Sequence, residues 1–328
     1  MSSPMRKTAV VGCGKVGYAY LEWLAAQGFS VIGLDPGPAV QQRIRQSFGD
    51  AAIANDYSDL VDCESIHICV PTEPAGDQSA DLSIIEAVAE QLLPVAQSSA
   101  VLRVISQRST CPPGTADRIG ATFDSVSYGV NPSFLRKAAI VNDTAAPERI
   151  ALGGSHEYIT YMQALYYSQA APHFVSASRP LVELLKYTEN TMDAVLVSFW
   201  NELLVYASQI GLAGEDFAYL LDRFGDRPKF AAAVRVPGKA FGLWCLPKDI
   251  SALQLAFSSA GCPSPILKAT QETNGYIATR TGVGSASSID LLKVDNGHLE
   301  LSHHGRSQVV EAMNALRTND GEPVQQPA

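Results

Sequence analysis

The sequence predicts an α/β protein, with a doubly wound parallel sheet, then an all-helical domain, then a short C-terminal tail carrying a hairpin. In the first half, short β-branched runs alternate with amphipathic stretches, which is typical of strand–helix–strand units. The second half has no Gly or Pro from Leu181 to Ile210, which indicates one long helix. Near the end, Asn296-Gly297 lies between two apolar runs, which is a strong hairpin signal.

These changes of pattern divide the chain into three expected parts. Residues 1–177 form the sheet domain, residues 178–282 the helical domain and residues 283–328 a short extension. The last ten residues, 319–328, are polar and are expected to be disordered, because they cannot bury enough apolar surface to offset the entropy of ordering.

The elements follow from apolar runs and their punctuation. Continuous apolar runs are typical of strands buried on both faces. Such strands are expected over residues 8–12, 31–35, 66–70, 101–106 and 125–130. Helices are expected over residues 18–27 and 82–92, after the Cys111–Gly114 turn, and over 181–210, 214–223, 247–260, 264–279 and 307–317. Pro180 suits the start of the long helix, because the first helical position tolerates a missing N–H.

Composition excludes several classes of protein. The net charge of −9 argues against a nucleic-acid or anionic-membrane surface, since both need clustered Lys and Arg. Six scattered cysteines show no CxxC pair and no zinc spacing, so no metal site is expected. No signal peptide or membrane-length apolar run is visible. We therefore expect a soluble cytoplasmic protein with reduced thiols.

A glycine-rich turn follows the first strand and opens the first helix. Gly12, Gly14 and Gly17 stand in a GxGxxG frame, which lets the backbone approach a pyrophosphate at a helix N-terminus. Asp35 ends the next strand, about 20 residues on, where a carboxylate accepts hydrogen bonds from an adenosine ribose and repels a 2′-phosphate. A glycine-rich turn by itself is also found where no ligand binds. The strand, the helix and the acid together predict a Rossmann domain that binds NAD.

Further motifs resemble those of the UDP-glucose/GDP-mannose dehydrogenase family, in that family's order over residues 7–280. The matching segments are ICVPTEP with ADLSIIEA, RSTCPPGT, NPSFLRKAA, APERIALGG, VELLKYTEN with SFWNELL, and FGLWCLPKD. The resemblance implies oxidation of a primary alcohol on a nucleotide sugar to a carboxylate, with two NAD and a cysteine-bound intermediate. It also implies a Rossmann domain, a dimerising helical middle and a C-terminal nucleotide domain.

The resemblance assigns the catalytic roles. Cys245, just before a Pro-started helix, would add to an aldehyde as thiolate, and oxidation of the thiohemiacetal would give a thioester. Lys186 and Asn190, four apart on one helix face, would hold the alkoxide. Asp249 would orient a water as base, and Thr110 would help to position it. Without the motif match, a buried structural cysteine and a solvated Lys beside a polar Asn are the commoner readings.

Two further sets of residues complete the expected site. The cofactor-binding residues are Gly12, Gly14, Lys15, Val16, Gly17, Asp35, Val70, Pro71, Thr72, Ser109 and Thr110. The residues expected to line the substrate pocket are Ser133, Phe134, Leu135, Lys137, Phe241, Gly242 and Trp244.

The chain departs from the family's pattern at three places. Ser133 and Lys137 replace the two glutamates of the motif NPEFLRE, of which the second assists thioester hydrolysis in the family. Ala240, Leu243 and Trp244 add bulk to a glycine-rich substrate loop. The chain also ends before a third domain. These differences predict a modified substrate and a changed hydrolysis step.

Other functions remain open from the sequence. A β-hydroxyacid dehydrogenase would share the Rossmann-plus-helical plan and the Lys/Asn pair but would transfer one hydride without a cysteine. A non-catalytic NAD-binding protein is a third interpretation. We expect a small-molecule alcohol, such as a sugar or nucleotide derivative, as substrate, and a homodimer through the apolar long helix.

Overall fold

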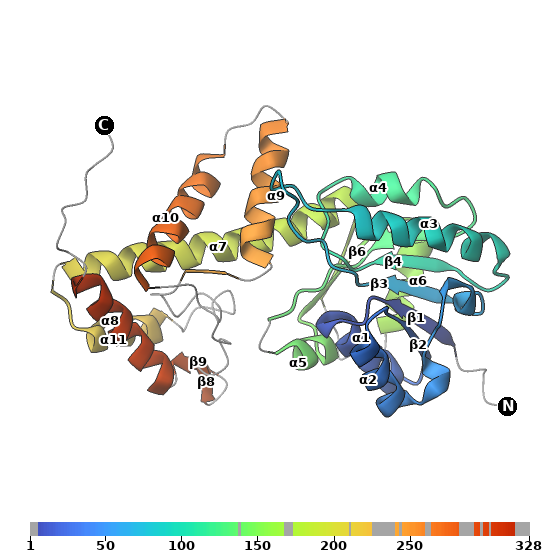
Figure 1. Cartoon of the computed structure of the whole chain (residues 1–328), viewed down its shortest axis with the longest axis horizontal. Coiled ribbons are helices and arrows are strands. Elements are labelled where there is room, and N and C mark those ends of the chain that lie inside the picture. Colours follow the sequence, from blue (N-terminus) through green and yellow to red (C-terminus); the bar gives the residue numbers. More distant parts are fainter. Residues whose placement is uncertain are drawn as a thin grey trace. The chain divides into compact units, whose positions relative to one another are not determined.

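The protein is described from a computed structural model (Figure 1). The described residues are 6–136, 139–166, 173–209, 211–224, 240–242, 245–259, 264–281, 292–295, 298–301 and 303–318. The chain divides into two compact units, Met1–Tyr187 and Thr188–Ala328.

The first unit is built on a mostly parallel sheet, which confirms the predicted fold class. The five predicted strands are present as β1 (Lys7–Val11), β2 (Ser30–Leu34), β3 (Ser65–Ile68), β4 (Val104–Gln107) and β5 (Ser127–Val130). They pair in parallel in the order β2-β1-β3-β4-β5. The order reverses between β1 and β3, and ligands of doubly wound sheets bind at this switch point.

Two more strands extend the sheet and were not predicted. They are β6 (Arg149–Gly153), which pairs antiparallel with β5 at Val130–Gly153, and β7 (His173–Ala177), which is parallel to β6. The residues of β7 are half-buried or exposed, because it is the edge strand, so it lacks the continuous apolar run that marked the central strands. The sheet is therefore mixed, not wholly parallel as expected.

Helices cover both faces of this sheet (Figure 1). One face packs on α1 (Lys15–Ala26), α2 (Pro38–Phe48) and α6 (His156–Tyr166), and the other on α3 (Ser83–Ser98) and α4 (Thr115–Gly120). Val10 belongs to the first core and its neighbours Ala9 and Val11 to the second, as strand alternation requires. Shorter elements are η1 (Asp50–Ala52), η2 (Tyr57–Leu60) and α5 (Ile140–Ala145). Of these helices, α2, α5 and α6 were not predicted.

The second unit is helical apart from a hairpin. The long predicted helix is α7 (Arg179–Gln209), whose first residues belong to the first unit. The remaining elements are α8 (Gly214–Phe224), α9 (Cys245–Ser259), α10 (Pro265–Thr281), β8 (Leu292–Asp295), β9 (His298–Leu301) and α11 (His303–Thr318). The strands β8 and β9 pair antiparallel, which confirms the hairpin, whereas Asn296, Gly297 and the segment 319–328 lie outside the described residues.

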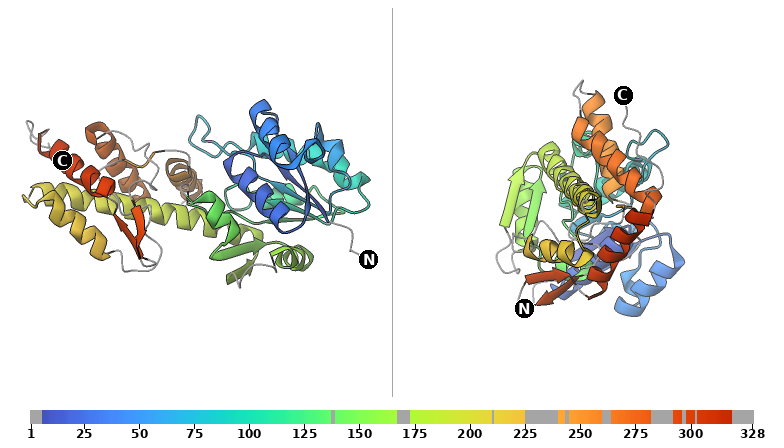
Figure 2. Two further views of the ribbon diagram at one scale, coloured as in Figure 1. Left: turned by 90° about the horizontal axis from the view of Figure 1, so that it is seen from below. Right: turned by 90° about the vertical axis from the view of Figure 1, so that its left-hand side faces the viewer.

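The core of this unit joins its helices. Trp200 and Leu204 of α7 are buried, and so are Phe217 of α8 and Ile250 of α9. Val309 of α11 joins the same cluster, so the C-terminal helix packs into this core, alongside α8 (Figure 2).

Candidate functional site

The glycine-rich turn between β1 and α1 has the geometry that a pyrophosphate requires. Gly12 has φ +85°, and a Cβ there would lie 2.9 Å from the backbone of Cys69 and Val70. A Cβ on Gly17 would lie 2.0 Å from the carbonyl oxygen of Gly12. A Cβ on Gly14 would meet no atom within 4 Å. The turn is thus closed on the protein side and open at Gly14, where α1 presents its first N–H groups.

Asp35 is fixed at the end of β2 by backbone donors. Its carboxylate accepts hydrogen bonds from the N–H of Cys13 at 2.8 Å and of Gly37 at 2.8 Å. A carboxylate has about four acceptor sites. Two backbone bonds therefore orient the group and leave capacity for the hydroxyls of a ribose.

The loops after β3 and β4 are tied together beside this turn. The Ser109 hydroxyl donates to the carbonyl of Val70 at 2.7 Å, and the Thr72 hydroxyl donates to the carbonyl of Thr110 at 2.8 Å. Because β3 and β4 are parallel to β1, these loops lie at the same carboxyl edge of the sheet as the glycine turn. The structure thus brings the predicted cofactor residues to one edge, and they fit a dinucleotide.

Lys186, a predicted catalytic residue, lies next to Phe134 of the predicted substrate pocket. Its side chain is 8% exposed, and its ammonium nitrogen lies 5.2 Å from the centroid of the Phe134 ring. Asn190 follows one turn later in α7, as the spacing predicted.

Asp249 is the centre of a buried polar cluster in the second unit. The Asn190 amide donates to one carboxylate oxygen, and the Lys248 ammonium lies 2.7 Å from the other. Neither Asp249 nor Lys248 is appreciably exposed. Lys248 was not predicted as a site residue, although its place beside Asp249 in the motif FGLWCLPKD was the available signal. A buried carboxylate with these two partners is held in one orientation.

Cys245 is the first residue of α9, and its side chain is exposed. It lies one helical turn before Asp249, so the two residues share a face of α9. Among the described cysteines, Cys13, Cys63 and Cys111 are buried and Cys69 is half-buried. Burial raises the pKa of the Cys63 thiol to about 12 and that of Cys69 to about 11. Cys245 is therefore the described cysteine with the access that a nucleophile needs.

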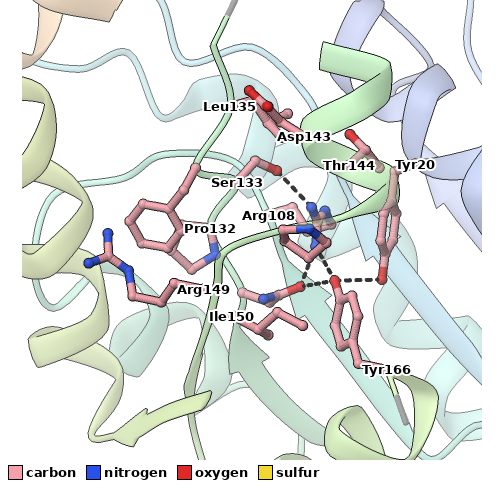
Figure 3. Close-up of a pocket in the computed structure, with 13 residues that line it drawn as sticks. Tyr20, Arg108, Pro132, Ser133, Leu135, Asp143, Thr144, Arg149, Ile150 and Tyr166 are labelled. Atoms are coloured by element: carbon pink, nitrogen blue, oxygen red, sulfur yellow. Dashed lines mark hydrogen bonds between the residues drawn. The ribbon is translucent and has the colours of Figure 1, made fainter. Parts of the chain in front are cut away.

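A buried network around Arg108 was missed in the sequence. Arg108 opens the motif RSTCPPGT but reads there as an ordinary surface residue. Its side chain is 7% exposed and donates to Asn131, to the Tyr166 hydroxyl at 2.8 Å and to the Ser133 hydroxyl at 2.7 Å. Figure 3 shows the Ser133 hydroxyl beside Arg108, with a dashed line for their hydrogen bond, and both residues line a cavity.

Some of the other residues predicted for the substrate pocket are part of a core or outside the described residues. Phe241 is buried in the core of the second unit. The Asn274 side chain accepts a hydrogen bond from the backbone N–H of Phe241 at 2.7 Å and donates one to its carbonyl at 2.8 Å. Lys137, Leu243 and Trp244 lie outside the described residues.

The described residues contain neither a metal-binding cluster nor a membrane-spanning helix. No group of three or more His, Cys, Asp or Glu side chains in the described ranges is placed to hold a metal ion. Within the same part of the chain, no helix combines the length and hydrophobicity of a bilayer crossing.

Comparison with known proteins gives consistent matches along the chain. The model of the UDP-glucose/GDP-mannose dehydrogenase NAD-binding domain matches residues 37–170, and that of the family's central domain matches residues 181–276. A GDP-mannose 6-dehydrogenase of Pseudomonas savastanoi pv. phaseolicola is 27% identical over 306 residues, which cover 82% of this chain and 68% of that protein. A UDP-glucose 6-dehydrogenase of Bacillus subtilis is 26% identical over 297 residues, 82% and 63% of the two chains.

Solved structures agree with these sequence matches. A UDP-glucose dehydrogenase from Pyrobaculum islandicum superposes with a TM-score of 0.75 at 27% identity, covering 84% of this chain and 69% of that one. A 3-hydroxyisobutyrate dehydrogenase of Mycobacterium tuberculosis has a TM-score of 0.64 at 17% identity, covering 85% of this chain and 95% of that one. The second likeness is one of fold alone.

Proposed function

The chain belongs to the UDP-glucose/GDP-mannose dehydrogenase family, and on that premise we propose that it oxidises a primary alcohol of a nucleotide sugar to the carboxylate through a thioester on Cys245. Its family makes it an NAD-dependent dehydrogenase that acts on a CH–OH group. The proposal adds the substrate class and the route.

The route follows from the chemistry of the residues. When bound, NAD accepts a hydride in each of two oxidations. Asp249 accepts the hydroxyl proton of the substrate through a water, Lys186 and Asn190 stabilise the resulting alkoxide, and loss of a hydride from its carbon gives an aldehyde. The Cys245 thiolate adds to the aldehyde carbon and forms a thiohemiacetal, whose oxidation yields a thioester. A water oriented by Asp249 attacks the thioester, which releases the carboxylate and returns the thiol.

One observation carries this proposal. Cys245 is exposed at the first turn of α9, where a helix N-terminus stabilises a thiolate, and Asp249 lies one turn further on. Asp249 is itself held by Asn190 and Lys248, so the base is oriented before substrate binds. A cysteine kept for packing would be buried instead.

The hydrolysis step is expected to differ from that of relatives with the usual motif. Ser133 and Lys137 replace two glutamates, so a cation stands where an acid assists hydrolysis in the resembling family. We propose that hydrolysis of the thioester at Cys245 is slow. The alternatives to release of the carboxylate are capture of the thioester by another nucleophile and an oxidation that stops at the aldehyde, with one NADH per alcohol. Rapid release of free carboxylate without an adduct in intact-protein mass spectrometry would contradict this.

Substitution of Cys245 tests the route. The wild type is expected to form two NADH per alcohol consumed, and Cys245→Ser to form one and release aldehyde. Acid formation should fall at least about a thousandfold, because removing a covalent nucleophile removes the second oxidation. Absorbance at the NADH band, with chromatography of aldehyde and acid, measures both. Cys63→Ala is the matched control, since Cys63 is buried outside the proposed site.

A β-hydroxyacid dehydrogenase activity is the second candidate. The observation that favours it is the fold of the Mycobacterium tuberculosis enzyme, of which this chain covers 95%. That activity needs one hydride transfer and no thiol, so Cys245→Ser would lose little of it. A Cys245→Ser variant with unchanged NADH formation would support this candidate against the thioester route.

We also propose that the protein works in a reducing compartment, the cytoplasm, and as a homodimer. No disulfide joins the described cysteines, which is usual in such compartments.

A further inference from the structure

Arg108 is a cation in the interior of the first unit without a negative partner among the described residues. Its side chain is 7% exposed, and its described contacts are made by neutral groups. Buried charges are normally paired or bind an ion, because taking a charge out of water costs several kcal/mol. The buried Arg108 guanidinium is therefore a candidate for binding an anion.

The hydrogen-bonding capacity of Arg108 is incompletely used. One terminal nitrogen donates to Asn131 and Tyr166, and the other donates to Ser133. Its Nε–H, also buried, has no acceptor among the described residues. A guanidinium has five N–H donors in a fixed fork that matches a carboxylate. Donors thus remain for an acidic ligand.

The surroundings of the guanidinium supply no anion. The Tyr20 ring lies 3.7 Å from the guanidinium carbon, and burial raises the pKa of its hydroxyl well above the usual value. Burial keeps the Cys69 thiol protonated, with a pKa of about 11, and lowers the pKa of His67 to about 3, so His67 is neutral.

The acid that lines the cavity beside this network is already paired. Asp143 lines the same cavity, but it accepts hydrogen bonds from the backbone N–H of Arg136 at 2.8 Å and from its side-chain Nε at 3.0 Å. Arg149 adds a second cation to the lining, although its guanidinium points away from Arg108 (Figure 3). The net charge around the cavity is positive.

A cavity of about 20 Å³ opens beside these groups. A polar cavity needs about 10–15 Å³ to hold one water. The space therefore admits a group slightly larger than water, such as the end of a carboxylate. Ser133 accepts from Arg108 through its oxygen, so its own hydroxyl proton remains available to a second acceptor.

We propose that this cavity binds the carboxylate group of a small molecule, held by the Arg108 guanidinium and the Ser133 hydroxyl. The inference rests on the proposed function only in placing Ser133 and its neighbours in the substrate pocket. If that placement holds, the substrate itself carries a carboxylate. Otherwise a free carboxylate occupies the site as a separate ligand.

The test places an acid next to Arg108. Arg108→Gln removes the cation but risks unfolding the buried network. Ser133→Glu instead supplies a fixed carboxylate at a position where the resembling family's motif has glutamate, and Ser133→Gln is its neutral match in size. Thermal unfolding of the full chain is followed with increasing sodium formate or sodium 3-hydroxypropanoate, without NAD and without turnover.

Wild type and Ser133→Gln are expected to show saturable stabilisation by both compounds. Ser133→Glu should bind at least about tenfold more weakly, because its carboxylate occupies the same donors. It should also unfold at a higher temperature than Ser133→Gln when no anion is added. Tighter binding of 3-hydroxypropanoate than of formate indicates a substrate carboxylate, and equal binding indicates a free one.

Equal, unsaturated shifts in all three proteins would overturn the inference, since they would reflect salt acting on the whole surface. The outcome is independent of the Cys245 experiment. Loss of anion binding leaves the thioester route untouched, and failure of that route leaves the anion site in place.

Discussion

Glu183 shows how one side chain can order several segments. It lies buried in the first turns of α7 and accepts hydrogen bonds from the N–H groups of Gly114, at 2.7 Å, and Ala116, at 2.9 Å. It also accepts from the Gln107 amide at 3.0 Å. The carboxylate thereby caps the start of α4 from another helix. Burial raises its pKa to about 7, although the backbone hydrogen bonds oppose that rise.

This raised pKa makes stability depend on pH. Glu183 has a pKa near 4.5 in the unfolded chain and about 7 in the folded chain, so the folded chain binds the proton more tightly. The contribution of this proton to the free energy of unfolding is therefore complete below pH 4.5 and is lost as the pH rises through about 7. Relative to Glu183→Gln, which cannot ionise, the wild type should lose up to roughly 3 kcal/mol between pH 4 and 8. Urea unfolding of both proteins across this range measures the difference. A difference that does not vary with pH would show that the carboxyl titrates normally.

The sequence was informative at residue scale where motifs carry the chemistry. The glycine turn, Asp35 and Cys245 could be predicted as site residues, because a GxGxxG frame, an acid at the end of the next strand and a thiol before a Pro-started helix are visible in the sequence. Arg108 was not found, because an arginine reads as exposed unless its neighbours are known. Tyr20, Asn131 and Tyr166, which surround it, come from separate parts of the chain that only the fold brings together.

At the scale of elements, punctuation by Pro and Gly predicted most boundaries within a few residues. The exception is α3, which was expected to end at residue 92 but continues to Ser98 through Pro94. Val95 and Ala96, beyond the proline, are buried on the sheet together with Leu92. Their burial outweighs the hydrogen bond that a proline cannot donate.

Pro94→Ala should therefore stabilise the protein. Pro94 is exposed, so the alanine leaves the core unchanged while its N–H can donate to the carbonyl of Glu90. We expect a gain of about 1–3 kcal/mol in the free energy of unfolding. Chemical denaturation measures it. Pro36→Ala, at an exposed position outside the helices, is the control and should lose up to about 1 kcal/mol, because only the unfolded chain gains freedom. Equal effects would show that α3 bears no strain at Pro94.

The missed strands have a common physical cause. β6 has four buried residues in a run, but the segment was identified only as part of the family motif APERIALGG and not as a strand. β7 is an edge strand, whose pattern resembles that of a loop. Its pairing with β6 comes from residues 24 apart in sequence, Arg149 and His173, and pairing at that distance leaves no local signal.

For the whole molecule, the homodimer expected through α7 remains a prediction. The apolar residues of α7 that suggested a dimer are in part covered by the second unit's own core, as Val197, Trp200 and Leu204 show. Other apolar side chains of α7 are exposed, namely Leu181 at 55%, Leu184 at 39% and Met192 at 46%. Their spacings of three and eight residues place them along one side of the helix.

A charge on this stripe should break a dimer. Light scattering is expected to give twice 35.0 kDa for the wild type and 35.0 kDa for Met192→Glu, because a buried, unpaired carboxylate opposes association. Ile266→Glu, at a 65% exposed position of α10, should remain dimeric. A wild type that is monomeric at high concentration would rule out the proposed assembly.

The three glycines of the first turn differ in what a methyl group would do there. At position 17 it would collide with the chain itself, and the turn could not form. At position 14 it would stand in unoccupied space and in an extended backbone conformation that any amino acid adopts. We therefore expect Gly14→Ala to fold like the wild type and to lose NAD binding, because the methyl group would stand where a pyrophosphate must approach the backbone. Such a variant would separate the effects of the cofactor from those of the fold.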